Sequence, residues 1–548
     1  MINLEKKQAI MLWGLISAAT LLLIFIYIQF LWSPLFFDDQ YLFLQIDEKG
    51  TQVIDSQSWS WLGVRSHPYA SFAWTKLAFG TDLIYFRLGN LALHVATSIA
   101  LFGLLRSLFS RLYQPQSSLY MTATQAAALG AVLFSLHPLA TYAVGYLVQR
   151  TIVMATLFSL LAMWVYIKGS IQNNFFWMWC CVPLYYLAVF SKEHAIMLPA
   201  ALLALTILLH PDWLTRLRQR WTMGMALGLI GLQVVLIKMS YIGTAYELEA
   251  PAMLGVDLGP LAYPLSVITQ CTLFFKYVFL WLLPQTAWTS IDMREPFARS
   301  LASWQLLGVA AYIAWGIASI VMLFKRGRLG LAGFAMFFPW VMFFSELATV
   351  RIQEPFVLYR SYLWFGMGVV ALPMAFAVVH KKWVLTIAFF VCILFSVFTL
   401  ERLATFSHPF LVWEDAKKLL ANKSDLRGQE RIYYNLAREQ YMNDFLEPAQ
   451  HNIKIALSIN PKSEDAHSVL GAIYLKSSMW HHAVDEYTLA RDINIKSGKS
   501  LNARYLMGRA KAYEGAGELK KAADDYLEAC RINFNICEML RKEATVLP

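Results

Sequence analysis

The sequence predicts an all-α protein made of a polytopic membrane bundle and a C-terminal helical-repeat unit. The chain of 548 residues is 58% hydrophobic and only 15% charged, whereas about a quarter of the residues of an ordinary soluble domain are charged. Its apolar residues fall into runs near the roughly 20 residues that cross a bilayer as a helix. Toward the C-terminus the composition becomes polar and repetitive. We therefore expect about eleven spans at 1–403, a linker at 404–429 and a repeat domain at 430–548.

The apolar runs define the expected spans. They are 10–32, 83–105, 124–143, 151–168, 175–190, 195–209, 222–241, 304–324, 329–347, 362–379 and 383–403. The first run follows Lys6 and Lys7 and shows no small-residue cleavage site, which predicts a retained signal-anchor helix. With these lysines inside, the later clusters of Lys and Arg in short loops all fall on the cytoplasmic side, as the positive-inside rule requires.

The basic residues need no other explanation. The net charge of +10 comes from these short loops, so we expect no nucleic-acid partner. The six cysteines show no metal-ligand spacing, and among them Cys530 and Cys537 are the two that could pair.

One further apolar segment, 263–283, would invert the topology if it crossed the membrane, because the basic cluster at 325–328 would then lie outside. We interpret it as an amphipathic or re-entrant element within a long outer loop, 242–303. Gln270 and Lys276 interrupt its apolar character.

The polar C-terminal sequence repeats. Ala449, Ile453 and Ala456 recur 34 residues later as Ala483, Tyr487 and Ala490, and 34 residues is the tetratricopeptide length. A third copy, offset by five inserted residues, contains Ala522, Tyr526 and Ala529. Small and aromatic residues at these positions predict paired helices that pack closely. With eleven spans, this domain lies outside the cytoplasm.

The same topology places the polar clusters beside the spans on the outer face. They are Asp38 and Asp39, Arg65 to Tyr69 including His67, His137, Gln149 and Arg150, Lys192 and Glu193, and Glu354, Tyr359 and Arg360. Carboxylates and cations at one rim suit sugar transfer from a phosphate-linked donor, which needs a base for the acceptor hydroxyl and cations for the leaving phosphate.

We predict a role for each cluster. Asp38 and Asp39 are the catalytic candidates. Arg150, Lys192, Glu193, Glu354, Tyr359 and Arg360 are candidates for binding the donor phosphate and sugar, and His67, Tyr69, Gln149 and His137 for the acceptor side of the rim.

Structural interpretations compete with these roles. Asp38 and Asp39 can cap a helix or hold a turn, and Lys192 and Glu193 can form an ion pair at a helix end. The two His-Pro pairs, at His67 and His137, are typical of turns and caps. Arg360 can be an anchor that reaches the interface.

In order along the chain, these motifs resemble the transmembrane-and-tetratricopeptide O-mannosyltransferases and their bacterial relatives. The motifs are the Asp38-Asp39 pair, Ser66-His67-Pro68-Tyr69, Leu136-His137-Pro138 before Gln149-Arg150, Ser191-Lys192-Glu193, and Glu354-Pro355 before Tyr359-Arg360. The resemblance implies a C-type glycosyltransferase (GT-C) fold and an inverting enzyme that uses a lipid-phosphate monosaccharide. Asp38 would be the base, although the family's second carboxylate is Glu where this chain has Asp39.

The leading hypothesis is an enzyme of the bacterial inner membrane that moves one sugar from a polyprenyl-phosphate carrier to Ser or Thr of a periplasmic protein, such as a type IV pilin. The repeats would dock this acceptor protein, and no cofactor or metal is expected. One alternative is a transferase or ligase acting on lipid-linked glycan. Another is a membrane scaffold that recruits partners through its repeats. A transporter is disfavoured, because the ionisable residues lie at helix ends.

Overall fold

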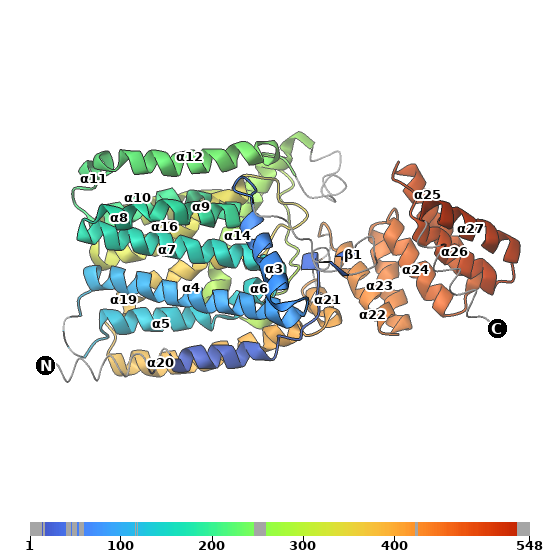
Figure 1. The fold of residues 1–548 in the computed structure, drawn as a ribbon, viewed down its shortest axis with the longest axis horizontal. Helices are drawn as coiled ribbons and strands as arrows, with labels where there is room; N and C mark the ends of the chain where they lie inside the picture. Colours follow the sequence, from blue (N-terminus) through green and yellow to red (C-terminus); the bar gives the residue numbers. More distant parts are fainter. Residues whose placement is uncertain are drawn as a thin grey trace. The chain divides into compact units, whose positions relative to one another are not determined.

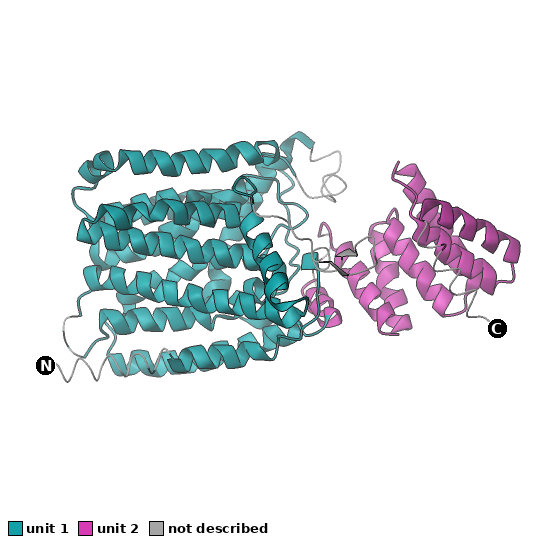
Figure 2. Cartoon of the chain, viewed as in Figure 1, with its two compact units in different colours: residues 1–408 teal, residues 409–548 magenta. Residues whose placement is uncertain are grey.

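The computed structural model describes residues 14, 17–39, 45–46, 52–53, 60–115, 117, 119–245, 259–421, 423, 426–533 and 537. The chain divides into two compact units, Met1–His408 and Pro409–Pro548 (Figure 2). The fold is all-α, apart from the short strands β1 (Gln45–Ile46) and β2 (Gln52–Val53), which pair antiparallel.

Unit 1 is built from long helices that run roughly parallel, among them α4, α5, α7 and α12 (Figure 1). Besides the helix Ser17–Ile28, its described α-helices are α3 (Ser66–Phe79), α4 (Leu83–Leu112), α5 (Ala123–Ser135), α6 (Thr141–Val144), α7 (Arg150–Gln172), α8 (Phe175–Trp179), α9 (Cys181–Ser191), α10 (Leu198–Leu209), α11 (Trp213–Gln219), α12 (Trp221–Lys238), α14 (Ala262–Leu282), α15 (Leu306–Lys325), α16 (Gly327–Met342), α17 (Phe344–Leu347), α18 (Ser361–Phe365), α19 (Leu372–Phe376) and α20 (Lys381–Thr405). Helix α3 lies at one end of the long helices and α11 at the other (Figure 1).

Within the described residues, seven helices are long and apolar enough to cross a membrane, or eight if the bent pair Ala123–Ser135 and Pro138–Val144 counts as one. Three predicted spans correspond to the shorter apolar helices Ser17–Ile28, Phe175–Ser191 and Glu193–Leu209. The predicted span 362–379 is broken into α18, the 3-10 helix Gly366–Ala371 and α19. The expected number of about eleven thus stays a prediction for these segments.

One of these seven long helices, Gly259–Leu282, contains α14, the segment for which we expected a re-entrant course. By length and composition it qualifies as a span. On its C-terminal side, Thr286 donates to Glu401 in the last turns of α20. The expected re-entrant course of 263–283 stays a prediction.

Helix α14 also packs along the segment before α18. The hydrogen bonds, in order along α14, join Ser266 to Arg351, Gln270 to Pro355, Tyr277 to Val357 and Trp281 to Ser361. The side chains of Ser266, Gln270 and Tyr277 thereby satisfy backbone groups of a segment that has little secondary structure of its own, as buried irregular backbone requires.

Unit 2 consists of α21 (Pro409–Lys418) and three helix pairs. The pairs are α22 (Glu430–Met442) with α23 (Leu446–Ile459), α24 (Glu464–Lys476) with α25 (Trp480–Lys496), and α26 (Ala503–Gly515) with α27 (Leu519–Ile532). The first helices of the pairs begin at 430, 464 and 503, which are separations of 34 and then 39 residues. The predicted repeat and its five-residue insertion are both present.

Two other predictions concern the edges of unit 2. Helix α21 lies inside the expected linker 404–429, and Lys417 on it donates to Asn452 of α23 at 2.9 Å. At the other edge, a disulfide joins Cys530 and Cys537, the two cysteines expected to be able to pair.

Candidate active site

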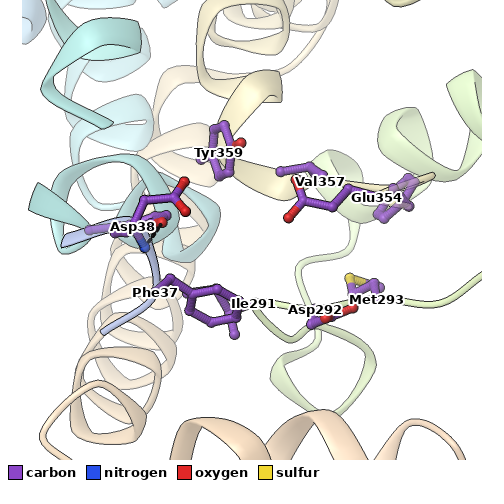
Figure 3. A pocket seen from close by; sticks show the side chains of 10 residues that line it. Phe37, Asp38, Ile291, Asp292, Met293, Glu354, Val357 and Tyr359 are labelled. Atoms are coloured by element: carbon purple, nitrogen blue, oxygen red, sulfur yellow. Dashed lines mark hydrogen bonds between the residues drawn. The ribbon is translucent and has the colours of Figure 1, made fainter. Parts of the chain in front are cut away.

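A pocket at one end of unit 1 contains the first carboxylate of the Asp38-Asp39 pair (Figure 3). Its lining residues are Phe37, Asp38, Tyr146, Ile291, Asp292, Met293, Glu354, Phe356, Val357 and Tyr359. The carboxylates of Asp38 and Glu354 point toward one another across it (Figure 3). Carboxylates that accept hydrogen bonds, set among aromatic walls, suit a ligand rich in hydroxyl groups.

The two adjacent aspartates have different surroundings. Asp38 is exposed and lines the pocket, whereas Asp39 is fully buried. The Asp39 carboxylate accepts hydrogen bonds from the backbone N–H of Val148 at 2.8 Å and of Leu147 at 3.4 Å. Burial raises the pKa of Asp39 to about 7, against the lowering effect of Arg87 and these two N–H groups. Asp39 therefore ties the Asp38 loop to the start of the 3-10 helix Leu147–Gln149.

Arg87 of α4 holds the loop that carries Asp38 through hydrogen bonds to its backbone. Its guanidinium donates to the carbonyls of Ser33 and Pro34, each at 2.7 Å, and to Gly145 at 3.1 Å. Phe37 adopts a φ of 52°, a conformation that is uncommon for a residue with a side chain and costs free energy. The backbone N–H of Asp38 donates to the Tyr146 hydroxyl at 3.0 Å. These contacts hold Asp38 toward the pocket.

A second wall comes from the loop between α14 and α15. Met293 pairs with Phe356 as an isolated antiparallel bridge. Arg294 contacts both carboxylate oxygens of Asp292, at 2.6 and 2.7 Å, and also donates to the carbonyl of Gln353. The buried Asp292–Arg294 pair thus joins this loop to the segment that carries Glu354.

A buried carboxylate, Glu346, pairs with the cations that lie behind the pocket residues Glu354 and Tyr359. Glu346 of α17 accepts from His194 at 2.7 Å and from Arg360 at 2.9 Å, and it lies 3.2 Å from Arg351. Arg360 also lies 3.6 Å from Glu354, which lines the pocket. Because removing water from two guanidinium groups is costly without a counterion, Glu346 stabilises both arginines at this position.

Lys192 joins this cationic group. It is 5% exposed, and its Nζ atom lies 5.7 Å from the centroid of the Tyr359 ring. Within the described residues, no oxygen accepts a hydrogen bond from this ammonium group. Burial lowers the pKa of Lys192 to about 7; Arg65, Arg360 and Arg351 also lower it, and Glu193 raises it.

Arg65 and Glu193 connect Lys192 to the entrance of α3. The guanidinium of Arg65 forms a bidentate ion pair with Glu193, with an Nε–Oε2 distance of 3.1 Å. Tyr69 lies near this pair: burial raises its pKa, Arg65 opposes this shift, and the Asp38 and Glu193 carboxylates add to it. Tyr69 and Asp38 are therefore close enough to interact electrostatically.

Nine of the predicted residues do not line the pocket: Asp39, Lys192, Glu193, Arg360 and Tyr69, described above, and Arg150, His137, His67 and Gln149. The Arg150 guanidinium donates to Asn90, Ser71 and the Phe86 carbonyl, at 2.7, 3.0 and 2.7 Å, and thereby joins α3, α4 and α7. His137 caps the 3-10 helix Pro138–Ala140, as the structural interpretation predicted. His67 packs against aromatic rings, and Gln149 is buried at the end of its 3-10 helix.

Sequence reasoning missed Arg87, Asp292 and Glu346. Arg87 and Glu346 each interrupt an apolar run, which is itself a signal, since ionisable residues within apolar segments are costly and usually functional. Asp292 does not lie within an apolar run, so the sequence gives no such signal for it. Among the described residues, no group of three or more His, Cys, Asp or Glu side chains is arranged to hold a metal ion.

Comparisons with known proteins add little. No protein-family model matches the sequence, and no curated protein matches it. One similar solved structure is the crystal structure of the APC/C hetero-tetramer Cut9-Hcn1, at 11% identity over 86% of this chain and 80% of that chain, with a TM-score of 0.22. A similarity this low supports no statement about fold or function.

Proposed function

We propose that this chain is a C-type membrane glycosyltransferase that moves a single sugar from a polyprenyl-phosphate carrier to a Ser or Thr hydroxyl of a protein. The observation that carries the proposal is the pocket itself. An exposed Asp38 faces a cavity whose far wall, Tyr359, lies beneath the buried cations Lys192 and Arg360. The proposed phosphate site, formed by these cations, would thus lie behind Tyr359, which lines the same pocket as the proposed base.

The proposed reaction divides the roles between these groups. The acceptor oxygen forms a bond to the anomeric carbon while the bond from that carbon to the phosphate oxygen breaks. Asp38 takes the hydroxyl proton, and the phosphate leaves with the bonding electron pair. Lys192 and Arg360 offset the charge that develops on the phosphate, as preorganised cations do in transition states. Attack opposite the leaving group inverts the anomeric centre.

The different surroundings of the two aspartates support Asp38 as the base. Asp39 is buried, and its carboxylate is occupied by two backbone N–H groups, so it has no path to an acceptor hydroxyl. Its role is to position the loop that carries Asp38. Glu354, on another wall of the pocket, is placed to accept hydrogen bonds from sugar hydroxyls.

The remaining parts of the proposal concern location and acceptor. The pocket would open at the periplasmic face of the bacterial inner membrane, because the basic loops lie at the opposite ends of the same helices. The helix pairs of unit 2 would bind the acceptor protein, a type IV pilin or another exported protein, since helical repeats commonly present extended binding surfaces.

The test is intact-mass analysis of extracytoplasmic proteins from cells that carry the wild-type chain, Asp38→Asn or Asp82→Asn. Asp82 is also exposed, and it caps α4, a role that Asn retains. We expect one protein to lose a single-sugar mass increment in Asp38→Asn and to keep it in Asp82→Asn. Full modification in Asp38→Asn at a normal membrane level would overturn the proposal. A change confined to glycolipid would show that the acceptor is a lipid-linked glycan.

A further inference from the structure

A cluster of arginines lies at the end of unit 1 opposite the pocket, where α10 meets α11. Helix α10, Leu198–Leu209, separates it from the pocket end, and its 12 residues span about 18 Å. The side chains in question are Arg111, Arg216, Arg220 and Arg326, and all four lie around His210. They come from α4, α11, the α11–α12 junction and the α15–α16 junction.

Two of these arginines brace the backbone. Arg326 donates from Nε to the carbonyl of Ile207 and from Nη2 to that of His210, both at 3.1 Å. Arg216 donates to Asp212 at 3.1 and 3.2 Å and to Asn173 at 2.9 Å. Asp212 is thus the acid that offsets one of the four charges.

Arg220 is the residue that requires an explanation. It is 8% exposed, and its Nη1 atom donates to two neutral hydroxyls, those of Tyr166 at 3.0 Å and Ser170 at 3.1 Å. In the described part of the chain, its Nε and Nη2 atoms have no acceptor and the guanidinium has no carboxylate partner. Burying an ion without a counterion is costly, so this guanidinium is suited to receive an anion.

The surroundings of His210 show the sign of the local field. Burial lowers the pKa of His210 to about 4; Arg216, Arg220 and Arg111 lower it further, and Asp212 opposes them. Its Nε2 atom is hydrogen-bonded to the Ser170 hydroxyl at 2.7 Å. The imidazole is therefore neutral near pH 7, and the net charge of the cluster is that of its arginines less one carboxylate.

Apolar side chains lie beside these charges. Leu214 and Leu217 on α11 and Trp221 at the start of α12 are exposed by 54%, 42% and 60%. Arginines next to exposed leucines and a tryptophan are typical of a segment that lies in the membrane interface. A ligand that contacts both groups would carry a negative headgroup and an apolar chain.

We propose that Arg220, with Arg111 and Arg216, binds the phosphate group of an anionic membrane lipid. The guanidinium fork matches phosphate oxygens, and Leu214, Leu217 and Trp221 would contact the acyl chains. This inference does not depend on sugar transfer, because no residue of the pocket takes part in it.

The test is native mass spectrometry of the detergent-solubilised full chain, titrated with phosphatidylglycerol and, separately, with phosphatidylcholine. We expect phosphatidylglycerol to be retained and Arg220→Gln to weaken its binding about tenfold, the loss expected for one charge-assisted hydrogen bond. Arg218→Gln is the matched control, because Arg218 lies on α11 two residues before Arg220, is exposed and carries the same charge. Arg111→Gln removes an exposed member of the cluster without touching the buried bonds.

The outcomes separate the possible ligands. Equal weakening by Arg218→Gln and Arg220→Gln would show a diffuse surface charge and overturn the site. Displacement of the lipid by millimolar inorganic phosphate would assign the cluster to a free anion instead. If Arg220→Gln does not fold, unchanged lipid binding in Arg111→Gln would by itself contradict the proposal.

Discussion

The ammonium group of Lys192 lies over the ring of Tyr359, 5.7 Å from its centroid, and that ring lines the pocket. The pKa of Lys192 is lowered to about 7, mainly by burial. Its positive charge is therefore largely lost between pH 7 and 8 in the protein without ligand. A phosphate bound beside Tyr359 would hold the proton on Lys192 and couple its own binding to pH.

The first prediction is that polyprenyl phosphate binds more weakly as the pH rises above 7, approaching tenfold per pH unit for one linked proton. In Lys192→Arg this dependence should be absent, because the guanidinium stays protonated. The measurement is the dissociation constant of polyprenyl phosphate between pH 6 and 8.5. The Arg variant also controls for ionisation of the lipid phosphate itself. The same slope in both proteins would rule out Lys192 as the phosphate-binding residue.

The ion pair beside Lys192 predicts opposite shifts of that pH midpoint. Arg65 lowers the pKa of Lys192 and Glu193 raises it. Glu193→Gln should therefore move the midpoint of phosphate binding to lower pH, and Arg65→Met to higher pH. Both substitutions break the same bidentate contact, so each controls for loss of the pair. Shifts in the same direction would indicate a purely structural effect.

Asp39 predicts a pH dependence of stability. Its pKa is raised from 3.8 to about 7, so between these values the folded chain binds more protons than the unfolded chain. The free energy of unfolding should consequently fall as the pH rises from about 4 to 7. Thermal unfolding of the detergent-solubilised chain should show this trend, reduced in Asp39→Asn and retained in Asp38→Asn. An unchanged slope in Asp39→Asn would contradict the assignment.

Glu346 predicts a large loss of stability on substitution. Glu346→Gln leaves the buried guanidinium groups of Arg351 and Arg360 without their shared counterion, and breaking a buried ion pair costs about 3–5 kcal/mol. Glu354→Gln is the control, because Glu354 is 32% exposed and lies 3.6 Å from Arg360. A pair of this kind contributes about 1 kcal/mol or less. Chemical denaturation that gave both variants equal losses would refute the distinction.

Some of these features follow from the sequence alone. The 34-residue period and the insertion before its third copy were visible because each repeat is a local pattern. The clustering of Asp38, Glu354 and Tyr359 was predicted from topology, and the structure places all three in one pocket. That prediction depends only on which loops share a face of the bundle.

Other features depend on contacts between distant residues. No sequence motif identifies Asp292, because its loop contacts the distant segment at 353–357. Arg150 was predicted to bind phosphate, but in the folded chain its guanidinium donates to Asn90 of another helix. The division of labour between Asp38 and Asp39 also has no sequence signal, because it arises from the backbone of Leu147 and Val148. The predicted span 362–379 is apolar throughout, and Gly366, Gly368 and Pro373 are the sequence signals for the 3-10 helix that interrupts it.

The last prediction concerns the packing of unit 2, where the ring of Tyr487 lies between Gly471 and Gly508. A Cβ atom on Gly508 would stand 2.2 Å from the ring, and one on Gly471 would stand 3.0 Å from it. Gly508→Ala should therefore destabilise unit 2 by about 1–3 kcal/mol, the usual cost of overpacking, despite the higher helix propensity of Ala. Gly471→Ala should cost less, because its contact is less severe.

A double-mutant cycle distinguishes this overpacking from an effect on the helix itself. Tyr487→Ala removes the ring and leaves room for the new methyl group, so Gly508→Ala should be neutral or stabilising in that background. Chemical denaturation of the four proteins of the cycle gives the coupling energy, which should be as large as the cost of the single substitution and of opposite sign. Additive losses would mean that Gly508 is needed for a reason other than its contact with Tyr487. The close helix packing that the small and aromatic residues of the repeat predict would then need another cause.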